Sequence, residues 1–517
     1  MKKLLLLFIS LFIVNFSYSE RYRIDYVNYD IIGITKKYAL EKAVEIDKTR
    51  VFESFEDFHK YIKDIQLLFN NERNLSTTIV NVSYGEKDPE EITSITLNIS
   101  TVDSKHFLAL PYPKYNSNDG FILNLKAKDT NFLGTMETLN TDINFSIEPQ
   151  TDNPDVYDTK FGINFDYDYP FKLWKMDSSW NNSFSIDYTI GRSSPEFSFD
   201  TGFTFSLPFK KYALEITLNQ GIHKDFDYEK YGDELYFTES ARLSLPYKIG
   251  RFFDSCDVTW TPYVAFSKNI DRDGISLDNR DLIGPALNAG HSLSTGRYNW
   301  HNNFRKGITF DFDQNIGFNY GKKKYTSQIS ATMKTFFSST IVGFASRFKA
   351  FYYMNTDDKI GSYIRGIRDE QNYINSDTKS LTTQAAILLN LDIPIHIITT
   401  DWLGYSNALF GEDSWISNHI KWMRIFDFEL QLNPFIDMAL CNNQVTGKTF
   451  AIKDGWYGAG LEVLVYPARW RSLVVRGSVG VDLGKTVINK VLPQLYDDSW
   501  RGSASSYEIS IGIGLHY

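Results

Sequence analysis

The segment GSYIRGIRDE (361–370) places Arg365 and Arg368 around Gly366, between flanks that alternate apolar and polar residues like β-strands. A guanidinium group cannot discard its charge in a protein, and its planar fork suits a carboxylate. A glycine allows the close approach or the positive φ that a tight loop tip needs. The segment therefore predicts either a sequestered loop tip with a carboxylate partner or an exposed hairpin turn with solvated charges.

Other residues that could do chemistry form no recognisable catalytic site. GHSLS (290–294) lacks the second glycine of a nucleophile elbow. The eight histidines show no paired-ligand spacing, and no phosphate-binding Gly-Lys-Ser/Thr loop occurs. Acidic pairs such as Asp497-Asp498 are typical of solvated loops. We therefore expect no enzyme activity, no cofactor and no metal.

The first 20 residues, MKKLLLLFISLFIVNFSYSE, have a basic head, an apolar run from Leu4 to Phe16 and a small-x-small site at Ser17–Ser19. This layout is typical of a secretory signal peptide, and the apolar run is short for a membrane-spanning helix. We expect a signal peptide over residues 1–19, with an uncleaved anchor helix as the alternative, and a mature chain that starts near Glu20.

Composition favours an exported membrane protein. The formal charge is −9 without a dense Lys/Arg block, which argues against nucleic acid as a partner. Cys256 and Cys441 lie far apart, so no disulfide framework is expected. After the signal peptide no stretch approaches the length of an apolar transmembrane helix. Yet the chain has 39 Phe, 32 Tyr and 10 Trp. A transmembrane β-barrel reconciles these facts, because only alternate residues face lipid and aromatic girdles mark its interfaces.

Residues 20–103 mix helical and strand patterns. Ser54 can cap a helix that has Asp57 three positions on, and apolar residues follow at helical spacing. Two strand patterns come next, at 77–85 and 91–102, with a turn-forming EKDPE between them. The order strand, helix, helix, strand, strand predicts a small α/β domain. The apolar residues of the longer helix are Phe55, Phe58, Ile62, Ile65 and Phe69.

From about residue 104 the helical period disappears and strand patterns recur to the end of the sequence. In two late strand patterns, Glu462, Arg476 and Asp482 lie opposite the apolar stripe. On a lipid face each charge would cost about 2–4 kcal/mol at mid-bilayer, so this face is expected to be a wet interior. The last segment, 507–517, alternates throughout: one face carries Tyr507, Ile509, Ile511, Ile513, Leu515 and Tyr517, and the other Glu508, Ser510, Gly512, Gly514 and His516.

The strand patterns set the expected architecture. About 17 candidate strands lie between Phe121 and Tyr517, and a single-chain bacterial barrel needs an even number. We therefore expect one mis-split segment and a mainly β protein, namely a 16-stranded transmembrane antiparallel β-barrel over residues 104–517 after one small α/β domain. Closure follows because the bilayer core offers no water to unpaired backbone groups.

Three short motifs precede the last strand at intervals along the barrel region. They are the turn Asn131, Phe132, Leu133 and Gly134 within residues 121–145, then Ile364, Arg365 and Gly366, and finally Phe435, Ile436 and Asp437.

With the signal peptide, the α/β domain and the aromatic last residue, these motifs resemble the BamA/TamA-type outer-membrane assembly family (bacterial surface antigen superfamily). Its members carry one or more POTRA domains before a 16-stranded barrel. The resemblance implies a POTRA-like periplasmic domain over residues 20–103, a first hairpin at 121–145, and a long loop folded into the barrel. By the same resemblance, Arg365 pairs with Asp437 on the inner wall. The chain departs from the family pattern in having Ile367 after the glycine, where an aromatic residue is usual. Its single module also differs from the several modules that the central assembly protein of the family generally carries.

The resemblance implies a protein of the outer membrane that aids insertion or export of client proteins without nucleotide hydrolysis. Its partners would be the lipid bilayer, client outer-membrane or secreted proteins, and accessory lipoproteins. The strand at 91–102 is one candidate edge for clients, and a weak seam is expected between residues 121–128 and 507–517. Gly512 and Gly514 suit weak pairing there, or are ordinary inner-face glycines. The rivals are a passive channel or surface antigen and a dedicated exporter of one secreted partner.

Overall fold

The computed structural model describes residues 20–116, 120–149, 157–224, 235–252, 256–270, 285–321, 323–367, 381–501 and 506–517. The expected signal peptide (1–19) and Arg368 lie outside the described residues. The chain divides into two compact units, of which the first ends at Ser104 and the second begins at Lys105. No described helix has the length and apolar character needed to cross a membrane.

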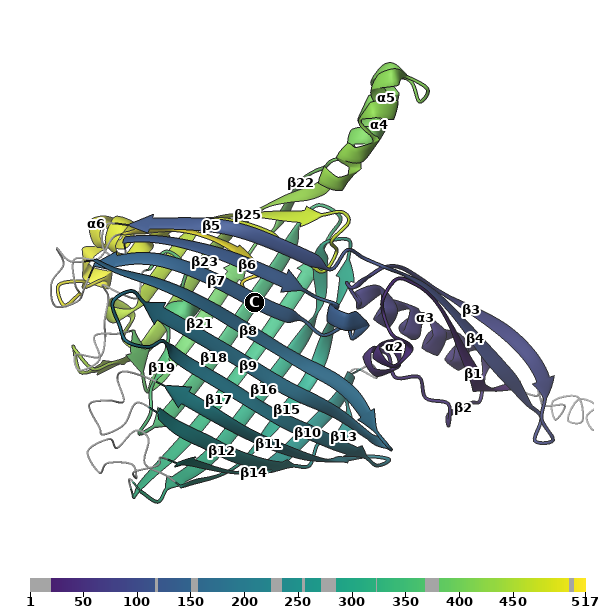
Figure 1. Ribbon diagram of the computed structural model, residues 1–517, viewed down its shortest axis with the longest axis horizontal. Coiled ribbons are helices and arrows are strands. Elements are labelled where there is room, and N and C mark those ends of the chain that lie inside the picture. The colour runs from purple at the N-terminus through teal and green to yellow at the C-terminus, as the bar shows by residue number, and fades with distance from the viewer. Residues whose placement is uncertain are drawn as a thin grey trace, which may run out of the picture. The chain divides into compact units, whose positions relative to one another are not determined.

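The N-terminal unit is a four-stranded sheet with two helices (Figure 1). The sheet order is β2-β1-β4-β3, with β1 parallel to β4 and β3 antiparallel to it. The predicted order of strands and helices is present, with the short β2 added. The elements are β1 (Arg21–Ile32), α2 (Lys37–Ala43), β2 (Val51–Phe52), α3 (Phe55–Asn71), β3 (Leu75–Lys87) and β4 (Ile92–Asp103).

Helix α3 begins as its sequence predicts. The Ser54 hydroxyl accepts a hydrogen bond from the Asp57 amide at 3.1 Å, which satisfies a donor of the first turn. Four of the five predicted apolar residues are buried, whereas Phe55 is 51% exposed, because its ring stacks on His59 one turn further on instead of entering the core. The four buried residues are Phe58, Ile62, Ile65 and Phe69.

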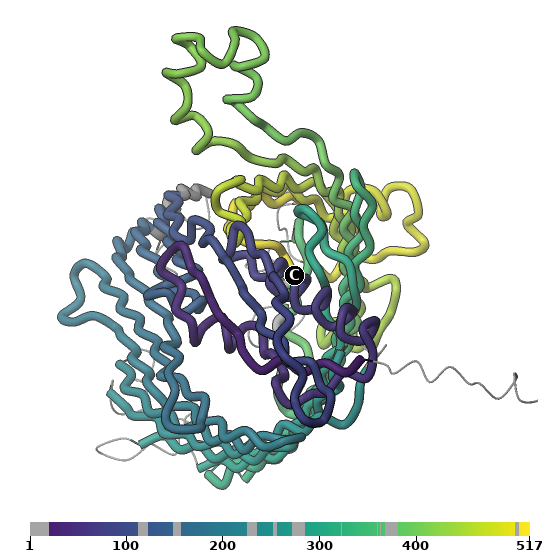
Figure 2. Tube along the Cα trace, turned by 90° about the vertical axis from the view of Figure 1, so that its right-hand side faces the viewer, coloured from purple at the N-terminus to yellow at the C-terminus, as the bar shows by residue number. Residues whose placement is uncertain are grey.

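The second unit is a large antiparallel sheet rolled into a barrel, seen near end-on as a ring in Figure 2. Its strands are β5 (Phe107–Asn116), β6 (Gly120–Asp129), β7 (Leu139–Pro149), β8 (Tyr157–Leu173), β9 (Met176–Thr189), β10 (Glu196–Pro208), β11 (Ala213–Lys224), β12 (Leu235–Ser244), β13 (Tyr247–Phe252), β14 (Cys256–Ile270), β15 (Ala286–His301), β16 (Phe304–Asn319), β17 (Lys324–Ser338), β18 (Gly343–Met354), β21 (Ala385–Asp392), β22 (Ile395–Thr399), β23 (Phe428–Asn443), β24 (Lys448–Thr449), β25 (Trp456–Pro467), β26 (Val475–Asp482) and β27 (Tyr507–Ile513).

The fold class, a mainly β protein with an antiparallel barrel, is confirmed, but the expected count of 16 strands is wrong. The described residues form 21 strand segments in the barrel order. β12 and β13 both pair with β14, β21 and β22 both pair with β23, and β24 only extends one hairpin, which leaves 18 strand paths. The number of strands is even because a further strand precedes Phe121, and not because one of the 17 candidates after Phe121 was a mis-split segment. That strand, β5, escaped notice because Pro111 and Pro113 interrupt its pattern.

The seam of the barrel lies between β27 and β5, which are neighbours in the strand order. The expected seam at residues 121–128 is wrong, because that segment is β6 and pairs with β5 on one side and β7 on the other. Over the described residues a register is defined at every other junction round the sheet, from β5–β6 to β26–β27. Two prolines in β5 fit this place, since proline within sheets is confined to edges and bulges.

The last residues of the sequence leave the sheet. The outer face of β27 is apolar as predicted, but the strand ends at Ile513. Gly514 has φ of +97° and its amide donates to Val474 O at 2.7 Å, which turns the chain off the strand. Leu515 and Tyr517, expected on the lipid face, follow this turn into the ring, where Figure 2 labels the end C. The Tyr517 hydroxyl donates to Ala345 O at 3.0 Å.

Helices also occur within the barrel unit, contrary to the expectation that helical structure ends near residue 104. Several short helical turns lie in the loops between the barrel strands. The longest described helix of the unit, α4, follows β22. These elements are η1 (Phe132–Gly134), η3 (Gly361–Tyr363), α4 (Trp402–Phe410), α5 (Trp415–His419), η4 (Lys421–Phe426), η5 (Ile452–Asp454), η6 (Gly484–Ile488), α6 (Asn489–Val491) and η7 (Pro493–Leu495).

The packing of α3 gives a test of the N-terminal core. Phe69 is fully buried, so Phe69→Ala should destabilise the unit by about 3–5 kcal/mol. Phe55→Ala removes an equal ring from the half-exposed position and should cost far less. Hydrogen exchange of the α3 amides in the full-length protein measures both effects. Equal losses of protection in the two variants would contradict the described core.

Candidate functional site: the arginine cluster in the barrel lumen

The long loop between β18 and β21 lies against the inner wall of the barrel. Its described parts contain β19 (Asp358–Lys359) and β20 (Thr382–Thr383), which pair with each other. Its apolar side chains are buried against wall residues, so this part of the lumen is not the wet interior that the sequence predicted. The loop contributes Ile360, Ile364, Ile367 and Leu381, and the wall contributes Phe351, Ala386, Leu388, Ala439, Cys441 and Trp456.

The structure brings Arg365 of this loop together with Asp437 of β23, as the resemblance implies. Arg365 Nε donates to Asp437 Oδ2 and Nη2 donates to Oδ1, both at 2.9 Å. The Arg365 backbone amide donates to the same Oδ2 at 2.8 Å. The carboxylate therefore holds the side chain and the backbone of the loop tip at once, which fixes position as well as charge.

Two more carboxylates surround the guanidinium group. Arg365 Nη2 lies 2.9 Å from Asp392 Oδ1 of β21, and Nη1 lies 3.8 Å from Glu462 Oε2 of β25. The ring of Phe435 stacks on the guanidinium, with 3.8 Å from its carbon to the ring centroid. Arg365 is only 6% exposed. Phe435 and Asp437 thus both contact Arg365, and both come from the predicted Phe-x-Asp motif.

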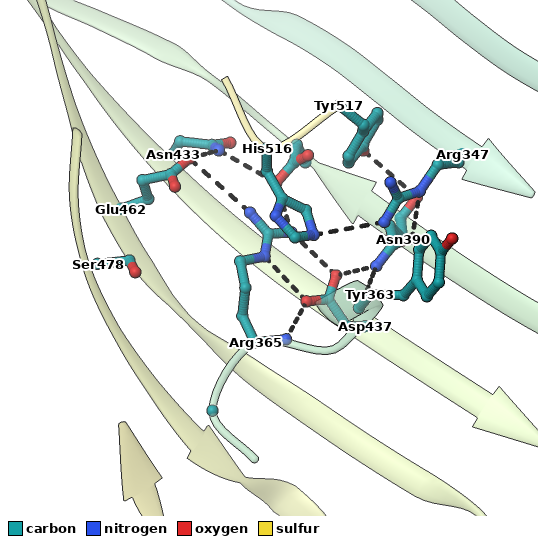
Figure 3. Close-up of polar contacts among 12 residues, drawn as sticks. Arg347, Tyr363, Arg365, Asn390, Asn433, Asp437, Glu462, Ser478, His516 and Tyr517 are labelled. Carbon is teal, nitrogen blue, oxygen red and sulfur yellow. Dashed lines mark hydrogen bonds and ion pairs between the residues drawn. The ribbon is translucent and has the colours of Figure 1, made fainter. Parts of the chain in front are cut away.

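Polar side chains of the wall connect these acidic groups (Figure 3). Asn390 donates to Asp437 Oδ1 at 2.8 Å and accepts from Arg347 Nε at 2.9 Å. Asn433 bridges Asp392 and Glu462, at 3.1 and 2.9 Å. Arg476 Nη1 lies 3.5 Å from Glu462 Oε1. Three arginines and three carboxylates therefore meet inside the barrel, and we call these six residues with Asn390 and Asn433 the lumen cluster.

Glycines let the loop tip touch the backbone of the wall. Gly366 has φ of +86°, as its place at the tip requires. A Cβ on Gly458 of β25 would lie 2.1 Å from Arg365 O, and one on Gly480 of β26 would lie 2.7 Å from Gly366 Cα. Both wall glycines are therefore needed for this approach. The sequence analysis did not predict this contact, although glycines on the charged face of the alternating strands are the signal that would have indicated it.

The loop tip also contacts the last strand. The Gly366 amide donates to Glu508 Oε2 of β27 at 2.9 Å. Within β27, Gly512 faces the same way as Glu508, and a Cβ at this position would lie 3.3 Å from Arg476 Nε. The loop is thus joined to the strand that borders the seam.

The last two residues of the sequence reach the same cluster. His516 Nε2 lies 3.4 Å from Arg347 Nη2, and Arg347 stacks on the Tyr517 ring at 4.8 Å. Arg305 of β16 donates to the backbone oxygen of Tyr517. Figure 3 shows both residues on the side of the cluster away from Ser478.

The turn at Asn131, Phe132 and Gly134 lies between β6 and β7, so it belongs to the second hairpin rather than the first. Asn131 is fully buried and its side-chain oxygen accepts from the Met136 amide at 2.8 Å. The Phe132 ring packs edge-on against Tyr167 at 4.9 Å. Thr130, beside the turn, lies 2.7 Å from Ser472 across the seam, hydroxyl to hydroxyl. The turn therefore lies beside the contact across the seam and does not contribute to the lumen cluster.

Sequence reasoning found part of the cluster. It named Arg365 and Asp437, and it placed Glu462 and Arg476 on the inner face without assigning them to the cluster. It missed Arg347, Asn390, Asn433 and the contact of Glu508, which alternation alone placed on the inner face. No group of acidic, histidine and cysteine residues in the described chain could hold a metal ion.

Comparisons with known proteins give structural similarities at low sequence identity. The chain is similar to CdiB from Acinetobacter baumannii (12% identity, TM-score 0.41, 89% of this chain and 70% of that chain). It is similar to CdiB from Escherichia coli (11%, 0.48, 95% and 76%). It is also similar to BamA from Haemophilus ducreyi lacking POTRA domains 1–3 (10%, 0.36, 95% and 84%).

No protein-family model matches the chain, and no curated protein matches it. The role proposed below rests on the contacts in the barrel and not on these similarities.

The glycine contacts give a first test of the cluster. Gly480→Ala would press a methyl group into the loop tip, and such overpacking costs about 1–3 kcal/mol. Gly477→Ala, three residues earlier in β26, meets open space and serves as the matched control. Urea unfolding and protease cleavage of the loop in the purified protein measure the two variants. Unchanged cleavage in Gly480→Ala would contradict the described contact.

The charge arrangement gives a second test. Arg365→Asp would place a fourth carboxylate among Asp392, Asp437 and Glu462. Stranding a buried charge costs about 3–5 kcal/mol, so the variant should lose stability and function. Adding Asp437→Arg should restore them only in part, because Asp392 and Glu462 would still face an acidic residue. Stability of the barrel to heat in detergent is the measurement, and a fully stable single variant would disprove the pairing.

Proposed function

We propose that this chain is an outer-membrane protein of BamA/TamA type that aids insertion or export of client proteins through the seam between β27 and β5. The observation that carries the proposal is the hydrogen bond from Gly366 to Glu508, because it ties the arginine-anchored loop to the strand at the seam. A loop held in the lumen by Arg365 can then control, through β27, whether the seam stays shut.

The seam has features that suit opening. β27 has seven residues, whereas β25 has 12 and β23 has 16, so the last strand offers a short ladder. β5 contains two prolines, which lack the amide hydrogen that a ladder needs. Since lipid offers no water to unpaired strand edges, an opened seam would favour pairing with a client strand. Such templating needs no nucleotide.

Part of the seam is bridged by the turn between β25 and β26. The Lys105 amide donates to Arg469 O, and Trp470 Nε1 donates to Phe107 O, both at 2.8 Å. Thr130 Oγ1 and Ser472 Oγ lie 2.7 Å apart. These contacts lie where the chain enters the barrel, beyond the end of β27, and they would have to break for the seam to open along its whole length.

The N-terminal unit would act as a POTRA-like periplasmic domain that presents a sheet edge to an extended client. The strand at 91–102 cannot be that edge, because it is β4 and pairs with β1 and β3. The edge available for β-augmentation is β3, which ends the sheet order and has 13 residues. Ile79 and Tyr84 of β3 are more than half exposed and would contact client side chains.

Two other functions stay open beside this proposal. A passive channel or surface antigen would use the barrel without opening its seam, and a dedicated exporter would serve a single secreted partner. Depleting the protein and quantifying other outer-membrane barrels separates the first from the assembly function. Unchanged barrels together with steady conductance by the purified protein would favour the channel, and a neighbouring gene for a large secreted β-helical protein would favour the exporter.

A disulfide across the seam tests the proposal directly. Thr130→Cys with Ser472→Cys should form a bond, because the two hydroxyl oxygens already lie 2.7 Å apart. In cells that carry only this variant, other outer-membrane barrels should fall several-fold, and a membrane-permeant reductant should restore them.

The two single-cysteine variants are the controls, and they should behave like the parent protein with its free Cys256 and Cys441. Normal levels of every other barrel in cells whose variant is fully cross-linked would exclude insertion or export through a seam that opens along its whole length.

A further inference from the structure

The connection between β22 and β23 is long and helical, unlike the short connection between β8 and β9 at the same end of the barrel. Antiparallel strands alternate in direction, so this connection lies at the barrel end where β5 begins, and we call that the entry end. There, only Trp174 and Lys175 join β8 to β9, whereas residues 400–427 join β22 to β23. These residues form a helical hairpin of α4, α5 and η4. Figures 1 and 2 both show it projecting outward from the barrel wall instead of covering the lumen.

The hairpin buries small polar side chains and exposes large apolar ones. In α4, α5 and η4, which the structure describes in full, the only buried residues are Ser406 and Ser417. Their hydroxyls lie 2.9 Å apart, and Ser417 Oγ also donates to Gly411 O at 2.8 Å. The large apolar side chains point outward and are each more than half exposed: Leu409, Phe410, Trp415, Trp422 and Phe426.

This arrangement fits an apolar surrounding. A hairpin in water buries its large apolar side chains and exposes its serines. Helices within lipid do the reverse, because small residues such as serine let the helices approach closely and nothing is gained by hiding leucine from lipid. Leu409, at 76% exposed, is the clearest case.

The hairpin continues the lipid-facing surface of the barrel without a flexible joint. Ile398 of β22 is exposed and pairs with Leu430, which lies on the outer face of β23, and α4 begins a few residues later. Trp402 clamps the base, since its amide donates to Asp427 Oδ1 at 3.0 Å and its indole nitrogen to Phe426 O at 3.2 Å. The Ala468 amide donates to Asp427 O at 2.8 Å, which joins the base to the next turn of the barrel.

The charged residues of the hairpin lie at its base, in its turn and on η4: Asp401 and Asp427 at the base, the exposed Glu412 and Asp413 between α4 and α5, and Lys421 and Arg424 on η4. Asp401 accepts from the Gly404 amide at 2.9 Å and caps α4, and Asp427 binds Trp402 as above. Lys421 and Arg424 lie on η4, where long basic side chains can reach phosphate groups. Tryptophan and tyrosine are enriched where a bilayer meets water, and the hairpin carries three tryptophans within residues 402–422.

We propose that residues 400–427 lie in the interfacial region of the bilayer leaflet at the entry end, as a monotopic anchor beside β22 and β23. The occupant of the outward apolar surface is phospholipid. This inference does not depend on the proposed function, because an anchor of this kind would serve a passive channel equally well.

A spin-label experiment tests the anchor on the full-length protein. A nitroxide is attached to Leu409→Cys in a Cys256→Ser background, and the purified protein is inserted into vesicles of phosphatidylethanolamine and phosphatidylglycerol. Ile398→Cys on the outer face of the wall and Lys37→Cys, exposed on α2 of the N-terminal unit, are the lipid and water controls. The Cys256→Ser protein without a new cysteine gives the background from the buried Cys441.

Oxygen concentrates in lipid and a charged nickel chelate stays in water, so their relative collision rates report the surroundings of the label. The ratio of oxygen to nickel collisions at position 409 should be several-fold above that at position 37 and approach that at position 398. Because the vesicles contain no other protein, a ratio at 409 equal to that at 37 would place the hairpin in water and overturn the proposal. It would then leave a protein partner as the occupant of the apolar surface.

Discussion

The burial of one permanent charge constrains the whole lumen. Arg365 cannot lose its proton, and removing an ion from water costs several kcal/mol even after relaxation. The barrel meets this cost with carboxylates from three adjacent strands, Asp392 on β21, Asp437 on β23 and Glu462 on β25. Because the loop cannot leave without stranding these charges, the cluster fixes where the loop lies.

The same constraint connects the loop to the seam. Gly458 and Gly480 let the loop backbone lie directly on β25 and β26, and the next amide along, that of Gly366, reaches Glu508 on β27. If β27 moved away from the barrel, the Gly366 amide would lose its acceptor, Glu508, while the ion pairs of Arg365 would still hold the loop. A seam strand controlled from inside the lumen is the physical basis of the proposed function.

Alternation was a reliable guide to the wall, because a two-residue period follows directly from strand geometry and the cost of charge in lipid. It failed where other forces decide. The prolines of β5 hid a strand that is tolerated at a seam, and the positive φ of Gly514 turned Tyr517 inward although its sequence pattern continues. The helices at 402–426 were missed because their large apolar residues point outward and serines lie between them, which reverses the pattern of a soluble helix.

The Arg365–Asp437 pair was predicted from the resemblance and not from spacing, since 72 positions separate the two residues. Contacts of this kind depend on strand register across the sheet, which a single sequence does not specify. The partners Asn390 and Asn433 follow once the register is known, because Asn390 lies opposite Asp437 and Asn433 lies opposite Glu462.

Hydrogen exchange of residues 360–367 in the full-length protein in a bilayer tests the central claim most directly. The account predicts slow exchange at Arg365 and Gly366, comparable to the strand amides of β23, and fast exchange at both in Asp437→Asn. Rapid exchange in the unmodified protein, or unchanged protection in that variant, would show that the buried charge does not hold the loop.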